Sequence, residues 1–506
     1  MALSSVNKNI LSSLLPQIVN IASNLILPAL IISTFGSQIN GLISSTKSIV
    51  GYISLVGAGI AVSTTQALYN PVATNNTTEV RGLLKATSQL FNRVGFIYVI
   101  ITIIVALLYP YFIDSNIEYT TTCFLVIVIG ISGASEFFAV GTCRSLLFAD
   151  RRTYICTSIQ ALSLLVSLIC AIILLKVGAN IIWVQLSISI VYILRAFLLK
   201  FYVTKHYPQY DYSLPEVTPI KTAVEKRGDA MIHQLSGLAV WSTQTIILSL
   251  MVGLDAASIY AVYNIIFSGL QSICSNINNA VTPFIGRSLA TESIDISIQK
   301  YDKIEYGFHI MSTIIYAVTA IMIIPFISIY TQNADINYIY REYALILVCI
   351  HILNIKRLPN NALINAAGHF KETRNRALIE ATICITGSLI FTILFGMYGV
   401  LIGTLCAIGW RSFDIIIYSN RHILKQSCKR SLSRLFRTFL IIIILYMLCR
   451  GLAYTEPKSY LTWINSSIYC SLISIILVII DSMLFDRKSS KYLLKYLIKR
   501  NGHIRV

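Results

Sequence analysis

The segment Gly41–Tyr69, GLISSTKSIVGYISLVGAGIAVSTTQALY, decides the fold class of this chain. It is long and apolar enough to cross a bilayer as an α-helix, which needs about 20 mainly apolar residues. Its single charge is Lys47, about two turns inside the first end. A cation at that depth is costly, so Lys47 either extends its stem back to the headgroups or faces a polar cavity between helices. The rest of the chain decides whether such a cavity is expected.

The whole chain has the composition of a protein that crosses the membrane many times. Its 506 residues are 56% hydrophobic and only 12% charged, about half the charged fraction of soluble domains. We expect an all-α integral membrane protein with about fourteen transmembrane helices. Apolar segments of suitable length lie at 10–35, 40–66, 93–113, 119–143, 154–175, 181–203, 230–252, 257–285, 306–330, 342–365, 376–396, 398–420, 436–453 and 462–484.

The basic residues predict the orientation of this helix bundle. If the N-terminus is cytoplasmic, the inner segments hold 35 of the 40 Lys and Arg residues, and the exceptions are Lys47, Lys176, Arg341, Arg450 and Lys458. The positive-inside rule therefore predicts that both termini are cytoplasmic. The net charge of +18 then faces the anionic inner leaflet. We expect no nucleic-acid binding, because the chain has no soluble domain to carry a basic face.

The chain is expected to consist of two halves. A segment with three prolines, 204–229, follows the sixth apolar span and is typical of a linker. One set of residues recurs after a constant offset of 217, namely Gln17, Gly36 and Lys47 against Gln234, Gly253 and Asn264. We predict two six-helix lobes, 1–203 and 230–420, related by a pseudo-twofold axis along the membrane normal. Residues 204–229 form a cytoplasmic linker, and 421–506 hold two more helices and a basic amphipathic tail.

No motif of an enzyme or a metal site is present. The sequence lacks GxSxG, HExxH, a Walker A motif and GxGxxG, and no DxD pair lies in an exposed loop. The eleven cysteines are scattered singly, which indicates neither a disulfide framework nor a zinc site. We therefore expect no catalytic residues, no metal and no resident cofactor.

Polar residues inside the apolar spans are the informative ones. Asn20 and Asn24 share one face of the first span, where they either join helices or line a cavity. Glu136 in the fourth span is either a paired structural acid or a site for a coupling ion. The second half of the chain adds Asp229, His233, Asn264 and Gln271.

The chemical balance of these residues points to an anionic cargo. Amides, hydroxyls and cations outnumber buried acids in the spans. Amides and hydroxyls suit the hydroxyl groups of sugars, and Lys and Arg suit phosphate. A site for cationic drugs would call for carboxylates instead. The sequence thus predicts a polyhydroxylated, anionic cargo.

One segment carries a family resemblance. Residues 362–405 read ALINAAGHFKETRNRALIEATICITGSLIFTILFGMYGVLIGTL. A small-residue stretch, Ala366–Gly368, leads into the basic element Phe370–Arg374 and then into Leu378–Glu380. A GxxGVxxGT turn follows, formed by Gly396, Gly399, Val400, Gly403 and Thr404. This pattern, together with the segment Phe35–Ile60, resembles the polysaccharide lipid flippases of the Wzx type, the O-antigen and capsule repeat-unit flippases of the MOP superfamily.

The resemblance implies a function in polysaccharide biosynthesis at the bacterial plasma (inner) membrane. The cargo would be an undecaprenyl-diphosphate-linked oligosaccharide, a repeat unit of O-antigen in lipopolysaccharide, of capsule or of exopolysaccharide. Two lobes would move it from the cytoplasmic to the outer leaflet by alternating access. We expect a monomer in the lipid bilayer, with other polysaccharide-assembly membrane proteins as partners.

The resemblance also implies cationic residues for the diphosphate on the first, second and eighth helices. Here only Lys47 and, at the inner end of the eighth helix, Arg287 are available. The predicted substrate-binding residues are Lys47, Asn20, Asn24, Asn264, Gln271, His233 and Arg287. Transport would be driven either by a Na+ or H+ gradient or by downstream consumption of the product. The predicted ion-coupling residues are Glu136, Asp229 and Glu380.

Two other functions remain open at this point. A cation-coupled multidrug exporter of the same superfamily would need buried acids in the N-terminal lobe, where Glu136 stands alone and Lys47 counts against a cationic cargo. A membrane-embedded glycan polymerase or ligase would need a large outer loop with catalytic residues. All predicted outer loops are short.

Overall fold

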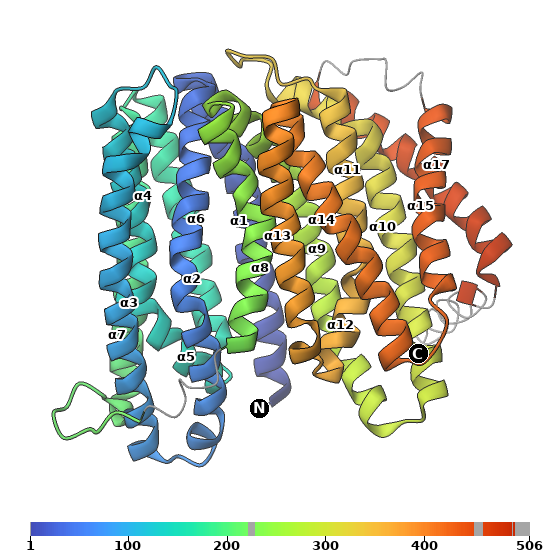
Figure 1. Ribbon diagram of the computed structural model, residues 1–506. Helices are drawn as coiled ribbons and strands as arrows, with labels where there is room; N and C mark the ends of the chain where they lie inside the picture. The colour runs from blue at the N-terminus through green and yellow to red at the C-terminus, as the bar shows by residue number, and fades with distance from the viewer. Residues whose placement is uncertain (1, 221–227, 450–458, 488, 491–506) are drawn as a thin grey trace, which may run out of the picture. The chain divides into compact units, whose positions relative to one another are not determined.

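The computed structural model describes residues 2–220, 228–449, 459–487, 489 and 490, and for 2–15, 56, 58, 62 and 228–235 it describes the backbone alone. All regular elements in these ranges are helical, and no strand occurs among them (Figure 1). The all-α fold class is therefore confirmed. The predicted amphipathic tail falls mainly on 491–506, outside the described residues.

The chain divides into two compact units, and each is described by itself. The first unit comprises residues 1–265 and 333–336, and the second comprises 266–332 and 337–506. The helices of the first unit are α1 (Ala2–Phe35), α2 (Ser37–Ala73), α3 (Thr77–Phe112), α4 (Tyr119–Ser135), the π-helical turn η1 (Glu136–Val140), α5 (Gly141–Ala149), α6 (Thr153–Lys176), α7 (Ile181–His206), the 3-10 turn η2 (Pro208–Tyr210), α8 (Gly228–Met251) and the first part of α9 (Leu254–Thr291).

The second unit contains the remainder of α9 and the later helices of the described residues. These are α10 (Ile294–Tyr330), α11 (Arg341–Lys356), α12 (Leu358–Ala367), α13 (Phe370–Phe395), α14 (Met397–Tyr418), the π-helical turn η4 (Ser419–Ile423), α15 (Lys429–Leu448) and α17 (Tyr460–Phe485). The boundary between the compact units lies within α9. The division into lobes at residues 203 and 230 therefore stays a prediction of sequence symmetry.

Most predicted spans coincide with a long apolar helix. Among the described residues, eleven helices are long and apolar enough to cross a membrane, and α2 makes a twelfth if its halves, bent by 41°, form one span. The predicted span 230–252 corresponds to α8, whose apolar part is Ser236–Met251. The predicted span 342–365 is broken at Arg357 between α11 and α12. Pro359 stands in the first turn of α12, where the N–H that proline lacks would have no intrahelical partner, so the break places this proline at a favourable position.

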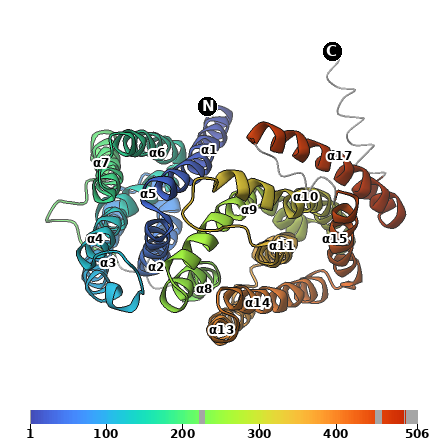
Figure 2. The same ribbon diagram turned by 90° about the horizontal axis from the view of Figure 1, so that it is seen from above.

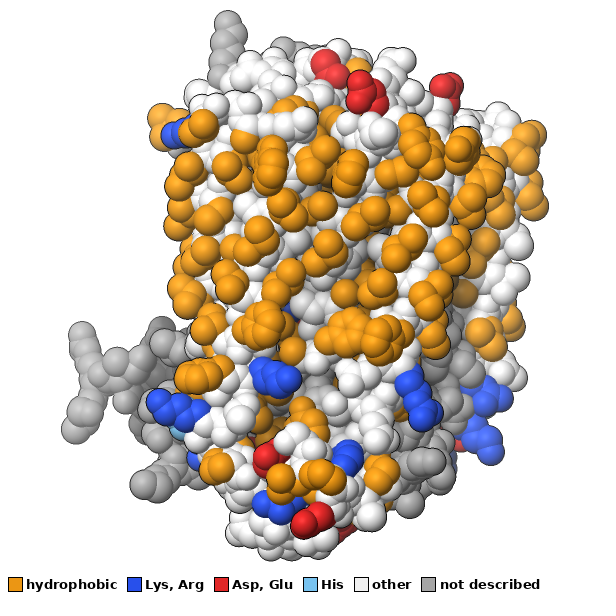
Figure 3. Space-filling model, turned by 90° about the vertical axis from the view of Figure 1, so that its left-hand side faces the viewer, with side chains coloured by type: hydrophobic (Ala, Val, Ile, Leu, Met, Phe, Trp, Pro, Cys, Tyr) orange, Lys and Arg blue, Asp and Glu red, His pale blue; other side chains and the backbone are white. Residues whose placement is uncertain are grey.

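The outer face of the first unit matches a lipid environment. Figure 3 shows a broad apolar band on this face, with Lys and Arg side chains gathered below it. Large apolar side chains of α3 and α7 are exposed there, among them Phe96, Ile100, Leu194 and Phe197. An apolar surface of this extent marks contact with a membrane.

Several basic residues assigned to the inner side by the sequence are buried within helices. Arg195, Arg357, Arg411 and Arg434 are each buried and each form an ion pair with an acid on another helix. Burying an arginine is tolerated when its charge is paired and hydrogen-bonded. These side chains therefore stabilise helix packing in addition to following the positive-inside rule.

The two glycines of the predicted repeat both occupy turns. Gly36 separates α1 from α2 with φ +87°, and Gly253 precedes α9 with φ +121°. Left-handed φ angles of this kind favour glycine, since it lacks a Cβ.

The first turns of α2 and α9 lie against each other within the first unit. The Gln38 amide is 3.5 Å from the Asp255 carboxylate, and Asn40 donates a 2.8 Å hydrogen bond to Ser258 Oγ. A Cβ at Gly41 would overlap the backbone of Leu254. Gln38 and Asp255 are separated by the predicted offset of 217. They are thus equivalent positions of the two predicted repeats in direct contact.

The first turn of α2 is capped by Asp335. The Asp335 carboxylate accepts hydrogen bonds from the Ser37 backbone N–H at 3.0 Å and from the Ser37 hydroxyl. A carboxylate at a helix N-terminus satisfies free N–H groups and complements the helix dipole. Partial burial acts to raise the pKa of Asp335, but the hydrogen bonds from Ser37 outweigh it and hold the pKa below its ordinary value of 3.8.

Replacing this cap is expected to cost measurable stability. Asp335→Ala should lower the free energy of unfolding by about 0.5–2 kcal/mol at neutral pH, the usual cost of losing a cap. A carboxylate whose pKa is lower in the folded chain stabilises the fold fully at pH values above 3.8. This stabilisation is lost as the pH falls through the folded-state pKa. Thermal unfolding in detergent should thus separate the variant from the native chain at pH 7 and bring them together at strongly acidic pH. A constant difference across this range would contradict the capping role.

The GxxGVxxGT motif forms the tight hairpin between α13 and α14, which lie side by side in Figure 2. Gly396 occupies the turn with φ +56°. At Gly403 and Gly387 the two helix backbones are in direct contact, since a Cβ on Gly387 would lie 3.3 Å from the Gly403 Cα. Ser388 Oγ adds a 3.2 Å hydrogen bond to the Val400 carbonyl. Small residues permit this close approach of helices in a membrane.

Candidate functional site

A polar cavity of about 330 Å³ lies inside the first unit. Its wall is formed by the α-helices α1, α2, α4, α6 and α7 and by the π-helical turn η1. Its polar lining residues are Asn20, Ser23, Asn24, Asn40, Ser44, Lys47, Ser132, Glu136, Ser167, Gln185, Ser189, Tyr192 and Arg195. A concave site with a few polar groups among apolar helices is the usual form of a small-molecule or headgroup site.

Lys47 lines this cavity. It lies on α2 about 15 Å along the helix from Ser37. Its side chain is solvent-accessible and lines the cavity. Within the described part of the chain, its ammonium forms no ion pair or hydrogen bond. Of the two interpretations that the sequence leaves open, the structure supports the one in which Lys47 faces a cavity.

Asn20 and Asn24 face the same cavity from α1. The i, i+4 spacing places them on one side of the helix, as the sequence predicts, and both amides are accessible. Gln185 of α7 adds a buried amide to the wall. These groups can donate and accept hydrogen bonds at once, which suits a ligand rich in hydroxyl groups.

Glu136 is held by two arginines at the edge of the cavity. Its carboxylate forms an ion pair with the Arg195 guanidinium, and its second oxygen lies 3.5 Å from Arg144 Nη1. Arg195 also stacks over the Tyr192 ring at 4.9 Å. Glu136 opens the π-helical turn η1, a local widening of the helix that often occurs at functional sites. The extra residue in this turn changes the direction in which the α4 side chains point.

The charge of the cavity is positive. Its charged lining residues are Lys47, Arg195 and Glu136, which leave one positive charge in excess. Because Glu136 and Arg195 neutralise each other, this excess charge is located at Lys47. The arrangement can therefore bind an anion next to hydrogen-bonding amides.

The structure brings four of the predicted residues together in this cavity. Asn20, Asn24, Lys47 and Glu136 line one cavity. Asn264 and Gln271 do not line it, although both are partly accessible on α9. The side chains of Asp229 and His233 lie outside the described residues.

Two further predicted residues lie in the second unit. Arg287 lines a different pocket, near the end of α9. Glu380 is buried between Arg357 at 2.6 Å and Arg411 at 3.4 Å. A carboxylate held by two arginines is already satisfied, so its geometry is that of a structural ion pair.

Among the cavity residues that sequence reasoning missed, three share one helix. Arg195, Gln185 and Tyr192 all lie on α7 at the cavity wall. The signal that was available is the spacing of Gln185, Tyr192 and Arg195 at near multiples of 3.6 on an otherwise apolar helix. From the sequence, Arg195 is instead counted among the basic residues of the cytoplasmic side, because a basic residue near a helix end marks that side in most membrane proteins.

Comparison with known proteins identifies the fold. No family model and no curated protein sequence matches this chain. Its structure is similar to an inward-facing multidrug resistance MATE family transporter of the MOP superfamily, with a TM-score of 0.65 and 13% identity over 81% of this chain and 95% of that chain. The chain has the MOP fold.

Two further MOP-fold structures extend this likeness. The lipid II flippase MurJ, in an inward closed conformation, has a TM-score of 0.61 and 13% identity over 95% of this chain and 99% of that chain. The MATE multidrug transporter DinF-BH has a TM-score of 0.63 and 12% identity over 84% of this chain and 96% of that chain. These MOP-fold neighbours are transporters and flippases, not enzymes. At such low identity they establish the fold and leave the cargo open.

Proposed function

We propose that this MOP-fold chain is a flippase for a lipid-linked, anionic oligosaccharide. The observation that carries the proposal is the unpaired ammonium of Lys47 in a cavity lined by the amides of Asn20, Asn24 and Gln185. The ammonium would bind the diphosphate, and the amides would bind sugar hydroxyls. An undecaprenyl-diphosphate-linked repeat unit, such as one of O-antigen, capsule or exopolysaccharide, has both groups.

The physical task of such a flippase is to replace lost hydration. A diphosphate or a sugar placed in hydrocarbon without partners loses its hydrogen bonds to water at a cost of several kcal/mol per group. A cavity with a cation and several amides supplies substitute partners while the polyprenyl tail stays in lipid. In our proposal the headgroup passes from the cytoplasmic to the outer leaflet of the bacterial inner membrane, and both chain termini are cytoplasmic.

The drive for transport is also part of the proposal. Coupling to Na+ or H+ through Glu136 would require that the cation displace Arg195 or Arg144 from the carboxylate. Consumption of the flipped product in the outer leaflet requires no such rearrangement.

Export of cationic drugs is the second candidate function, since two of the MOP-fold neighbours are multidrug transporters. A cationic cargo would meet the positive charge of Lys47, and Glu136, the acid of the cavity lining, is already paired. Like charges in a shared site repel, so this cavity favours the anionic cargo. Deletion of the gene should distinguish the two functions, because drug susceptibility would change with surface glycan intact only for a drug exporter.

Substitution of Lys47 tests the flippase proposal. Lys47→Ala should lower the flipping rate of an undecaprenyl-diphosphate-linked oligosaccharide in proteoliposomes about 10- to 100-fold, since a hydrogen bond between charged groups contributes about 1.5–3 kcal/mol. Lys47→Arg keeps the charge and should retain most of the activity. Lys176→Ala, which removes an exposed lysine at the end of α6, is the matched control. Equal flipping by Lys47→Ala and the native chain would refute the proposed role.

A further inference from the structure

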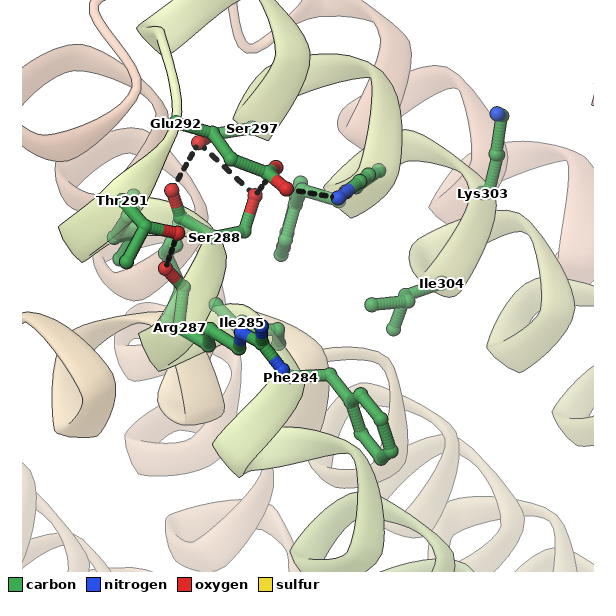
Figure 4. Close-up of a pocket in the computed structure, with 13 residues that line it drawn as sticks. Phe284, Ile285, Arg287, Ser288, Thr291, Glu292, Ser297, Lys303 and Ile304 are labelled. Carbon is green, nitrogen blue, oxygen red and sulfur yellow. Dashed lines mark hydrogen bonds and ion pairs between the residues drawn. The ribbon is translucent and has the colours of Figure 1, made fainter.

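A second pocket, of about 730 Å³, lies within the second unit between the end of α9 and the first turns of α10. Leu363 of α12 contributes to its wall. Figure 4 shows the pocket with Arg287 and Phe284 on one side and Lys303 and Ile304 on the other. None of its residues belongs to the cavity around Lys47.

The pocket carries an excess of positive charge. Arg287, Lys300 and Lys303 line it together with one acid, Glu292. Glu292 accepts a 2.7 Å hydrogen bond from Ser288 and pairs with the Lys300 ammonium (Figure 4). These hydrogen bonds from Lys300 and Ser288 lower the pKa of Glu292. The Arg287 guanidinium has no hydrogen bond or ion pair to any described residue, so its charge is available to a ligand.

A buried hydroxyl in the same wall also lacks a partner. Tyr301 lines the pocket and is only 2% exposed. Its hydroxyl forms no hydrogen bond within the described residues. A buried hydroxyl without a partner costs about 1–3 kcal/mol, so such a group usually has a water or a ligand as its acceptor. This observation is independent of the charge and points to an oxygen-bearing ligand.

Apolar side chains border the same pocket. Phe284 is 71% exposed, and Leu289 and Ile304 also line the pocket. About 40 Å of helix separates Lys303 from Tyr330 at the other end of α10. A bilayer with its headgroups is about 40–45 Å thick, which places the lysine near the depth of lipid phosphates on the predicted cytoplasmic side. Cations beside an exposed aromatic ring at this depth match the boundary between headgroups and acyl chains.

We propose that this pocket binds the phosphate of an anionic membrane lipid. The phosphate oxygens accept hydrogen bonds from Arg287 and Lys303, a further oxygen accepts one from the Tyr301 hydroxyl, and an acyl chain lies along Phe284. Basic pockets between helices on the cytoplasmic side are suited to phosphate headgroups. The proposal does not rest on the proposed flippase function, because the pocket and the cavity share no residue.

Binding of defined lipids to the purified chain tests this proposal. Native mass spectrometry would measure binding of phosphatidylglycerol, zwitterionic phosphatidylcholine and undecaprenyl phosphate, each titrated separately. We expect the anionic lipids to bind at least 10-fold more tightly than phosphatidylcholine. The more tightly bound of the two anionic lipids identifies the source of the phosphate. Competition by inorganic phosphate as strong as that by phosphatidylglycerol would overturn the proposal, because the apolar wall would then contribute nothing.

Three variants separate a specific site from general electrostatic attraction. Arg287→Gln should weaken phosphatidylglycerol binding at least 10-fold, and Tyr301→Phe should weaken it about 2- to 10-fold, the effect of one hydrogen bond. Lys371→Gln removes an equal charge from an exposed position on α13 outside the pocket and should leave binding unchanged. Equal effects of Arg287→Gln and Lys371→Gln would overturn the proposal. Thermal unfolding of each variant verifies its fold, and the accessible position of Arg287 makes misfolding of that variant unexpected.

Discussion

Gly403→Ala is expected to destabilise the protein by about 3 kcal/mol or more. A Cβ on Gly403 would lie 2.6 Å from the Ser388 Cα and 2.5 Å from the Gly387 carbonyl carbon. Both are backbone atoms of α13, so no side chain can rotate away, and the two helices must separate. Overpacking of a core commonly costs about 1–3 kcal/mol even where side chains can adjust. Total stabilities of about 5–15 kcal/mol leave little reserve.

Gly409→Ala on the same helix is the matched control. Its nearest neighbour to a new Cβ would be the Leu353 Cδ1 at 4.0 Å, an ordinary contact distance. We expect thermal unfolding in detergent to show a large loss for Gly403→Ala and almost none for Gly409→Ala. Similar unfolding temperatures for the two variants would contradict the close contact between α13 and α14.

Arg434→Met is expected to cost about 3–5 kcal/mol, the usual penalty for removing one partner of a buried ion pair. Arg434 is only 2% exposed. Its guanidinium lies 2.7 Å from Asp486, 2.8 Å from Glu305 and 3.0 Å from Asp302. Methionine would fill a similar volume but would leave these carboxylates without their central cation. The second unit should therefore lose the packing of α10 against α15 and α17.

Arg430→Gln separates burial from charge in this prediction. Arg430 also contacts Asp302 and Asp486 but its side chain is 48% exposed. Exposed ion pairs contribute about 0–1 kcal/mol, so this variant should unfold at nearly the native temperature. Limited proteolysis after graded heating would compare the two variants. If Arg430→Gln were as damaging as Arg434→Met, burial would not be the cause of the effect.

The fold was predictable because each span contains its own signal. A helix of about 20 apolar residues spans the hydrocarbon core and pairs its own backbone groups, so its signal does not depend on the neighbouring helices. The positions of Gly36 and Gly396 in turns were likewise visible, since glycine is the residue that permits positive φ. The break at Arg357 was missed because the apolar residues on both sides of it have the pattern of one continuous span.

The cavity was predictable only in part, for a different reason. Asn20, Asn24 and Lys47 are costly in lipid, so the sequence alone indicates that they have polar surroundings. The pairing of Arg195 with Glu136 was not visible in the sequence, because the two residues are 59 positions apart in the chain. A basic residue near the inner end of a helix has the same sequence context whether its side chain contacts lipid headgroups or pairs with a buried acid. The π-helical turn at Glu136 was also hidden, since the apolar period of the segment does not reveal one extra residue.

The contact between Gln38 and Asp255 has a consequence for the ancestry of the chain. Near a twofold axis, a residue of one copy meets the same residue of the other copy. Two identical six-helix chains would have to place the same side chain on both sides of this contact. A single chain with two copies of the segment is free of that requirement, and here an amide faces a carboxylate. Duplication and fusion of an ancestral gene would thus have permitted an amide–carboxylate pair at this contact, which a symmetric homodimer with identical residues there could not encode.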